Sequence, residues 1–197
     1  MYEHVNKTFF KKRLLNRIKI PLNRVLVLTK QNLLLKWRNL IMATAKYSRY
    51  EYNATTSISR ANIGDMSRAQ EAFINYWKGK VSKAALTTTL GGLATTALEK
   101  VFNKTSYTAI PSYLVSALTS VNEWEKNEVL RVAEEGDSQI NKLLRIFNDN
   151  KAYISISFRV NYLAFKNLAT GNTDFTIVQG NIIPIRVLTS SGGSIPL

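Results

Sequence analysis

The segment AYISISFRVNYLAF (residues 152–165) alternates apolar and polar side chains more regularly than any other part of the chain. Its polar positions include Ser155, Ser157 and Arg159. Strict alternation predicts a β-strand with one buried face, because successive side chains of a strand point to opposite faces. Residues 166–174 (KNLATGNTD) contain the Gly, Asn and Asp that turns prefer, and residues 174–189 (DFTIVQGNIIPIRVLT) read as a returning strand. The sequence therefore predicts a C-terminal antiparallel β-hairpin.

Three details refine the predicted hairpin. Gly180 and Asn181 indicate a bulge or a second turn, and Pro184 suits a sheet edge or a strand end, because proline cannot donate a ladder hydrogen bond. The last residues, 190–197 (SSGGSIPL), read as a flexible tail. A two-stranded hairpin is marginal in water, so its apolar face must pack on other elements.

Helical periodicity precedes the hairpin. We expect a helix over 65–78 with Asp65 as its N-cap, core helices within the uncharged stretches 84–98 and 105–122, and a long helix over 121–148 with a break or bend at Gly136. The predicted fold class is α+β: a mostly helical body with a C-terminal antiparallel β-hairpin and a basic amphipathic N-terminal arm.

Positive charge is concentrated at the start of the chain. The 197 residues carry a net charge of +14; residues 1–50 hold 12 basic side chains and one acidic, or +11, and the other 147 residues hold 15 basic and 12 acidic, or +3. This asymmetry indicates an anionic partner such as lipid headgroups, an envelope polymer or nucleic acid. We divide the chain into a basic arm (1–45), a linker (46–64, rich in Ser, Thr, Asn and Tyr) and a helical domain ending in the hairpin (65–197).

The arm also has an apolar face. Phe10, Leu14 and Ile18 recur every four residues, Pro21 ends that helical pattern, and a second amphipathic pattern covers 22–45. Such a helix can lie at a membrane interface, or its apolar stripe can pack on the body. The predicted contacts with an anionic surface are the cations Lys11, Lys12, Arg13, Arg17 and Lys19 and the apolar side chains Phe9, Phe10, Leu14 and Trp37.

Several classes of chemistry lack the residues they need. The chain has no cysteine, and its single histidine, His4, lies near the N-terminus, so thiolate nucleophiles, Cys-containing zinc sites and His-pair metal sites are excluded. No phosphate-binding glycine motif is present. The six acids of residues 121–137 read as a solvated face rather than as a glycosidase pair. We therefore expect a non-enzymatic protein with no metal and no cofactor.

Three alternatives to surface association stay open at this stage. A nucleic-acid-binding module would use the arm's cations, with Trp37, Tyr47, Tyr50 and Tyr52 available for stacking. A structural subunit would self-associate through the hairpin edge or through pairing of the arm with the acidic helix. A membrane-inserting effector would use residues 84–122 as a hairpin, although both uncharged stretches are short for a span.

The location of the protein is not fixed by its sequence. A cleavable signal peptide is not recognisable, because an uncharged run of the basic region such as Val25 to Thr29 is shorter than a secretory apolar segment. Association with a membrane or an envelope is the location we favour.

Overall fold

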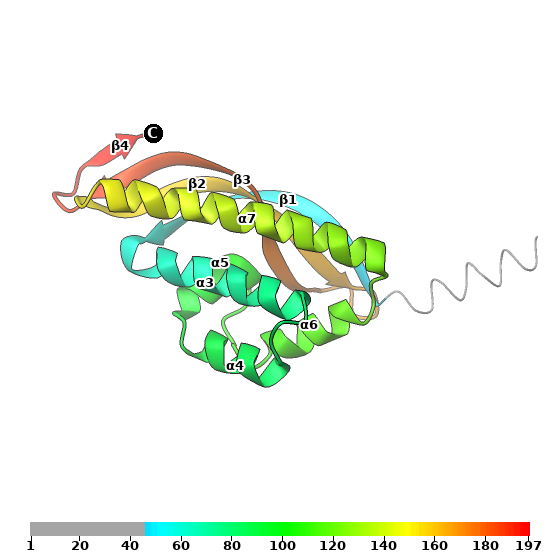
Figure 1. Cartoon of the computed structure of the whole chain (residues 1–197). Helices are drawn as coiled ribbons and strands as arrows, with labels where there is room; N and C mark the ends of the chain where they lie inside the picture. The colour runs from blue at the N-terminus through cyan, green and yellow to red at the C-terminus, as the bar shows by residue number, and fades with distance from the viewer. Residues whose placement is uncertain (1–45) are drawn as a thin grey trace, which may run out of the picture. The chain divides into compact units, whose positions relative to one another are not determined.

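The computed structural model describes residues 46–197, which fold into five α-helices and one four-stranded antiparallel sheet. In chain order the elements are β1 (Tyr47–Ser59), α3 (Arg60–Trp77), α4 (Lys83–Gly91), α5 (Thr95–Phe102), α6 (Ile110–Leu118), α7 (Glu123–Asp149), β2 (Tyr153–Asn167), β3 (Thr173–Thr189) and β4 (Ser194–Pro196). The long helix α7 runs along the sheet, and the shorter helices gather around α3 (Figure 1). These residues confirm the α+β class. The predicted basic arm lies outside the described residues.

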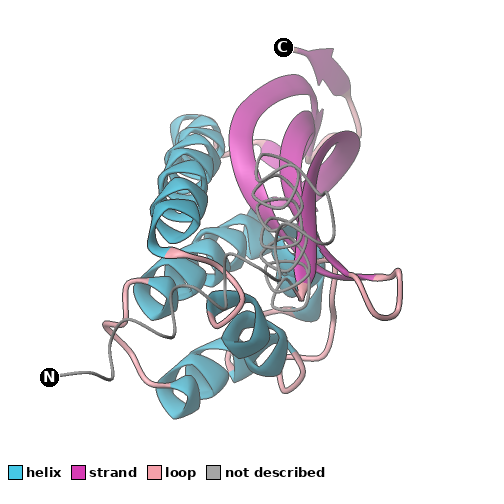
Figure 2. Cartoon of the chain, turned by 90° about the vertical axis from the view of Figure 1, so that its right-hand side faces the viewer, coloured by secondary structure: helices cyan, strands magenta, loops and turns pink. Residues whose placement is uncertain are grey.

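The predicted hairpin is part of a larger sheet. β2 and β3 pair antiparallel as expected, but β1 adds to the other side of β2 and β4 adds to β3, which gives the order β1-β2-β3-β4. Figure 2 shows this sheet on one side of the body and most of the helices on the other.

The interpretation of residues 46–64 as a linker is wrong. They form the 13-residue strand β1 and the first turn of α3, and β1 pairs with β2 without a register shift from Tyr47–Asn167 to Ser59–Ser155. Its Ser, Thr and Asn residues resemble a linker because half of them lie on the solvated face of the sheet. The other face carries Ile58, which is buried, and the half-buried Ala54 and Tyr52.

The prediction of a flexible C-terminal tail is also wrong for its central residues. Ser194–Pro196 form β4, which pairs with Arg186, Val187 and Leu188 of β3. The chain reverses at Gly192, whose φ of +83° favours glycine, and the Thr189 amide donates to the Gly193 carbonyl at 2.8 Å. Backbone pairing, which composition does not encode, orders this short strand.

The irregularity in β3 is confirmed. Gly180 and Asn181 have positive φ values of 128° and 48°, and the pairing of β2 with β3 shifts on both sides of Asn161. Pro184 pairs opposite Phe158 of β2. β4 begins to pair with β3 only at Arg186, so Pro184 lies on a sheet edge, where its missing N–H costs no ladder hydrogen bond.

The helices follow the predicted order with shifted boundaries. α3 begins at Arg60 after Ser59, so Asp65 is not its N-cap; the Asp65 carboxylate instead accepts the Ala94 amide at 2.8 Å and pairs with Arg68. α7 begins with a capping box, in which Asn122 and Glu125 each accept the other's backbone amide. It continues through Gly136, where a break or bend was expected.

Aromatic packing closes the core where α3 meets the sheet. Trp77 stacks on Phe73 and lies 6.2 Å from Phe165, which stacks on Phe175 at 4.3 Å between ring centroids. All four side chains are fully buried, and the Trp77 indole N–H donates to the Lys126 carbonyl at 3.0 Å. This bond ties the end of α3 to the start of α7.

The free edge of β3 is closed by a side chain. The buried Gln70 amide nitrogen donates to the carbonyls of Val178 (2.8 Å) and Ala133 (3.0 Å), and its oxygen accepts the Val178 amide at 3.3 Å. The side chain thus makes the two bonds that a neighbouring strand would make at Val178. Gly136 lets α7 approach the same point, since an added Cβ would lie 2.1 Å from the Val178 oxygen.

Candidate binding surfaces

The predicted surface-binding residues cannot be placed. All nine lie within residues 1–45, outside the part of the chain that the structure describes: Phe9, Phe10, Lys11, Lys12, Arg13, Leu14, Arg17, Lys19 and Trp37. The candidate surfaces below therefore come from residues 46–197 alone.

The acidic residues of α7 have partners within the body. Glu125 pairs with Arg49 of β1, Glu134 with Lys78, and Arg131 lies between Glu128 and Glu135. Burial of the Glu125 carboxyl raises its pKa, but the Asn122 amide and the Arg49 guanidinium outweigh that effect and hold its pKa below the ordinary value. Ion pairs within the described body thus engage the five glutamates of α7, whereas Asp137 and Asp149 make none there.

Asp137 is the carboxyl group of this helix with a raised pKa. Partial burial is the main cause and the charge of Glu71 adds to it, while Ser67 and Asn141 donate to the carboxylate at 3.5 and 3.1 Å and oppose the shift. A raised carboxyl pKa can mark a general acid. The effect of Glu71 on this pKa places the two carboxyl groups near one another, and Glu71 also lines the groove described next.

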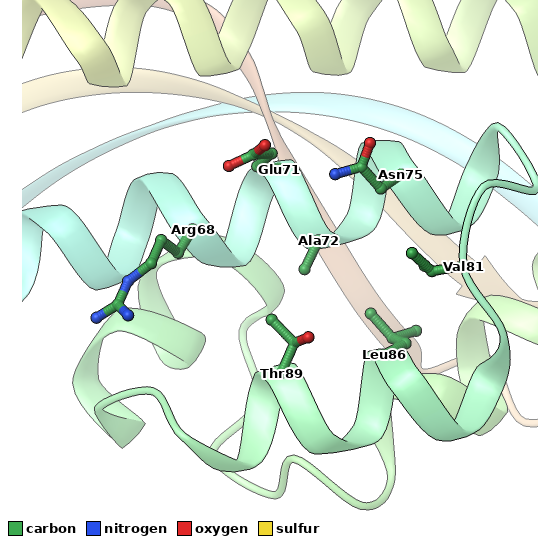
Figure 3. Close-up of a pocket in the computed structure, with 7 residues that line it drawn as sticks. All are labelled: Arg68, Glu71, Ala72, Asn75, Val81, Leu86 and Thr89. Atoms are coloured by element: carbon green, nitrogen blue, oxygen red, sulfur yellow. The ribbon is translucent and has the colours of Figure 1, made fainter.

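A groove of about 250 Å³ lies between α3 and α4. In Figure 3, Ala72 of α3 and Leu86 and Thr89 of α4 point toward one another across this space, and the Arg68 guanidinium turns outward at one end. The lining carries one carboxylate, Glu71, and one guanidinium, which already pairs with Asp65. The groove can accept a small apolar group, and the Thr89 hydroxyl in its lining donates to the Ala85 carbonyl at 3.0 Å.

A second groove of about 250 Å³ lies where α7 begins. Val129, Val132 and Leu163 give it apolar walls, and Trp124, which is 74% exposed, stands beside it. Its charged side chains are engaged with one another or with neighbours: Arg49 pairs with Glu125, and Glu51 accepts from Gln179 at 2.7 Å.

The tyrosines proposed for base stacking are partly used by the fold. Tyr47 is buried and donates to Asp174 at 2.8 Å, and Tyr52 stacks on Tyr162 with ring centroids 5.3 Å apart. Burial raises the pKa of Tyr47, Tyr52 and Tyr162 above the ordinary value of a tyrosine. Of the three tyrosines named for stacking, Tyr50 alone is exposed.

Two arginines lie on a solvent-exposed face of the sheet, which we call the outer face. Register pairs Arg159 with Thr55 on one side and Ile183 on the other, and pairs Ser157 with Ser57 and Arg186. Residues opposite one another in an antiparallel ladder share a face, so the two arginines lie on one surface with Asn53, Thr55, Ser57, Ser157, Asn161 and Ile183. Both guanidinium-bearing residues are exposed, and within residues 46–197 neither makes an ion pair.

Sequence reasoning missed the outer face although a signal was present. Arg159 occupies a polar position of the alternating segment, and Arg186 lies in the returning strand. Their adjacency depends on the register of β2 with β3, which shifts near Gly180 and again between Ser157 and Phe158. A count of alternation from Arg159 could place it on the polar face, but could not place Arg186 beside Ser157.

The uncharged stretches form short packed helices. Leu86 and Leu90 of α4, Leu98 and Val101 of α5, and Leu114 of α6 are buried in the body's core. Among the described helices, none combines the length and apolar character that crossing a bilayer requires. In the same residues, no cluster of three or more His, Asp or Glu side chains is arranged to hold a metal ion.

Comparisons with known proteins add no relative: no family model matches the chain, and the searches of curated proteins and of solved structures found no match.

Proposed function

We propose that this protein is a non-enzymatic interaction protein that associates with an anionic membrane or envelope surface through its cationic residues 1–45, with the outer face of the sheet as a second contact. The observation that carries the proposal is the distribution of charge in the body. Four acids of α7 are paired with Lys78, Arg49 and Arg131, whereas Arg159 and Arg186 are exposed among hydroxyl side chains.

The chemistry of the outer face suits phosphate or carboxylate groups. A guanidinium can donate two parallel hydrogen bonds to such a group, and the surrounding Ser and Thr hydroxyls can donate further ones. Each basic side chain near an anionic leaflet contributes about 1 kcal/mol to association. The arm, with +9 over residues 1–45, supplies the larger share, because it holds ten basic side chains against one acidic.

Binding of the full chain to vesicles tests the proposal. We expect sedimentation with vesicles of phosphatidylcholine mixed with phosphatidylserine, little with phosphatidylcholine alone, and loss of binding as salt is raised, since salt screens exposed charges. Equal binding to both kinds of vesicle, independent of salt, would refute the proposal.

Matched charge variants assign the contacts. Replacing Lys11, Lys12, Arg13, Arg17 and Lys19 by Gln should cause the largest loss of binding, and the pair Arg159→Gln and Arg186→Gln a smaller loss. The control pair Arg68→Gln and Arg131→Gln removes the same charge as the outer-face pair from residues that already have carboxylate partners. If the control pair weakens binding as much as the outer-face pair, net charge rather than the outer face is responsible.

A further inference from the structure

The outer edge of β1 is long, regular and exposed. The strand has 13 residues, a length of about 43 Å at 3.3 Å per residue, whereas strands commonly have five or six. Tyr50, Glu51, Asn53, Thr55 and Ser57 are all exposed, and in the described residues the sheet has no strand beyond β1.

The backbone groups on this edge can be assigned. The Leu168 amide donates to the Lys46 carbonyl at 3.1 Å, so even-numbered residues of this segment turn their N–H and C=O groups toward β2. Odd-numbered residues therefore turn theirs outward. From Arg49 to Ser57 they form a continuous row of donors and acceptors.

The edge lacks the features that usually prevent strand pairing. β1 contains no proline and no lysine, and its register against β2 has no bulge. Its two charged residues lie near one end and are engaged, Arg49 with Glu125 and Glu51 with Gln179. Residues 52–59 (YNATTSIS) carry no charge.

We propose that β1 pairs antiparallel with β1 of a second copy of this chain, about a two-fold axis at Asn53. This register overlaps the two strands from end to end, because Tyr47 then lies opposite Ser59 of the other copy. It sets Arg49 opposite Ser57 and Glu51 opposite Thr55, so no like charges meet, and two Asn53 side chains face one another. A two-fold interface requires one self-complementary surface, and this edge satisfies that requirement.

The pairing goes beyond surface association and has a consequence for it. The two sheets join into one, and the outer face of each copy continues into that of the other. Arg159 and Arg186 of both copies would then lie on one continuous sheet, which raises avidity for an extended anionic surface.

Cysteine cross-linking tests the register, and the absence of native cysteine makes each variant a single-thiol protein. The Cα atoms of a hydrogen-bonded antiparallel pair are about 5.5 Å apart, within the range for a disulfide. Asn53→Cys should form a disulfide-linked dimer of the full chain at least about tenfold faster than Thr170→Cys, an exposed control in the β2–β3 turn, because pairing raises the local thiol concentration. Mixed Glu51→Cys and Thr55→Cys chains should cross-link to each other faster than Glu51→Cys cross-links to itself.

Proline substitution tests the edge itself. Thr55→Pro removes an outward N–H and should convert the dimer to a monomer in sedimentation equilibrium, while Thr55→Ala keeps the N–H and should stay dimeric. Circular dichroism of both variants shows whether each is folded. If Thr55→Pro does not fold, the cross-linking rates alone decide.

The proposal is overturned if the full chain is monomeric at all concentrations and Asn53→Cys cross-links no faster than Thr170→Cys, as would follow if residues 1–45 or another partner cover the edge. These measurements use no vesicles and high salt, so their outcome is independent of whether the protein binds anionic surfaces.

Discussion

At Val178 the edge of β3 meets the amide of Gln70, whereas at Asn53 the edge of β1 is exposed. Both edges belong to one sheet and carry the same kind of backbone groups. The β3 edge is closed by a buried side chain, by the close approach of α7 at Gly136 and, further along, by β4. The comparison shows that an edge can be closed without a long neighbouring strand, and that the opposite edge lacks each of these devices in the described residues.

The largest loss of stability should come from a substitution that adds a side-chain atom between α7 and the closed edge of β3. Gly136→Ala places a Cβ 2.1 Å from the Val178 oxygen, which forces α7 away from β3 and should lower the free energy of unfolding by about 3 kcal/mol. Urea unfolding measures this loss. The control Gly64→Ala lies in α3 with nothing within 4 Å of the added Cβ, and should be neutral or stabilising by about 0.5–1 kcal/mol. Equal effects of the two variants would contradict the close approach.

Removing the Gln70 side chain, which closes the β3 edge, should lower the free energy of unfolding slightly less than Gly136→Ala does. Gln70→Leu leaves the buried Val178 N–H without a partner and removes donors from two carbonyls, so we expect a loss of about 2–3 kcal/mol in the same assay. Gln179→Leu removes an exposed bond to Glu51 and should cost about 0.5 kcal/mol or less. A small effect of Gln70→Leu would mean that the β3 edge does not depend on this amide.

Proline substitutions at two adjacent positions of β1 should lower the free energy of unfolding by different amounts, because only alternate residues donate backbone hydrogen bonds to β2. Thr56→Pro removes an N–H that faces β2 and should lower the free energy of unfolding by about 2 kcal/mol. Thr55→Pro removes an outward N–H and should cost clearly less in the monomer. Urea unfolding of both variants, at concentrations where the protein is monomeric, measures the two losses. Equal losses would show that the assignment of outward-facing N–H and C=O groups in β1 is wrong.

The smallest effect should come from the ion pair where β1 meets α7. The folded-state pKa of Glu125 is lowered, so its stabilising effect is present above its unfolded pKa and is lost as pH falls through the lower folded pKa. Glu125→Gln should therefore cost about 0.5–1 kcal/mol at neutral pH and close to nothing at about pH 2. Unfolding free energies of both proteins across this range provide the measurement. A difference that persists in acid would indicate packing rather than charge.

Sequence periodicity predicts the elements whose own residues determine them. β2 alternates strictly and α7 has helical spacing, so both were placed within a few residues. The irregularity at Gly180 and the edge position of Pro184 were also anticipated, because each follows from a local backbone preference.

The missed elements depend on distant partners. β1 pairs with a strand about a hundred residues away, and its solvated Ser and Thr residues resemble a linker until that pairing is known. β4 has three residues and is ordered only by its pairing with β3. Asp65 looked like an N-cap, but the helix begins earlier, and its carboxylate caps the Ala94 amide instead.

The residues of the candidate surfaces also fall into two groups, those that the sequence identifies and those that depend on contacts between distant segments. The arm residues Lys11 to Lys19 were identified from charge and spacing alone and lie outside the described residues. Arg159 follows from alternation, whereas Arg186 needed the register and Gln70 needed the contact between α3 and β3. No local sequence pattern identifies a glutamine whose side chain makes the backbone hydrogen bonds that a neighbouring strand would otherwise make.

The amide of Gln70 also has a consequence for the proposed pairing through β1. A sheet with two available sides can recruit copies without end, and growth of that kind leads to fibres. With one side blocked, recruitment stops after a single event and yields a closed pair. If β1 pairs with a second copy as proposed, the polar side chain buried beside Val178 would restrict that assembly to a pair as well as contribute to stability.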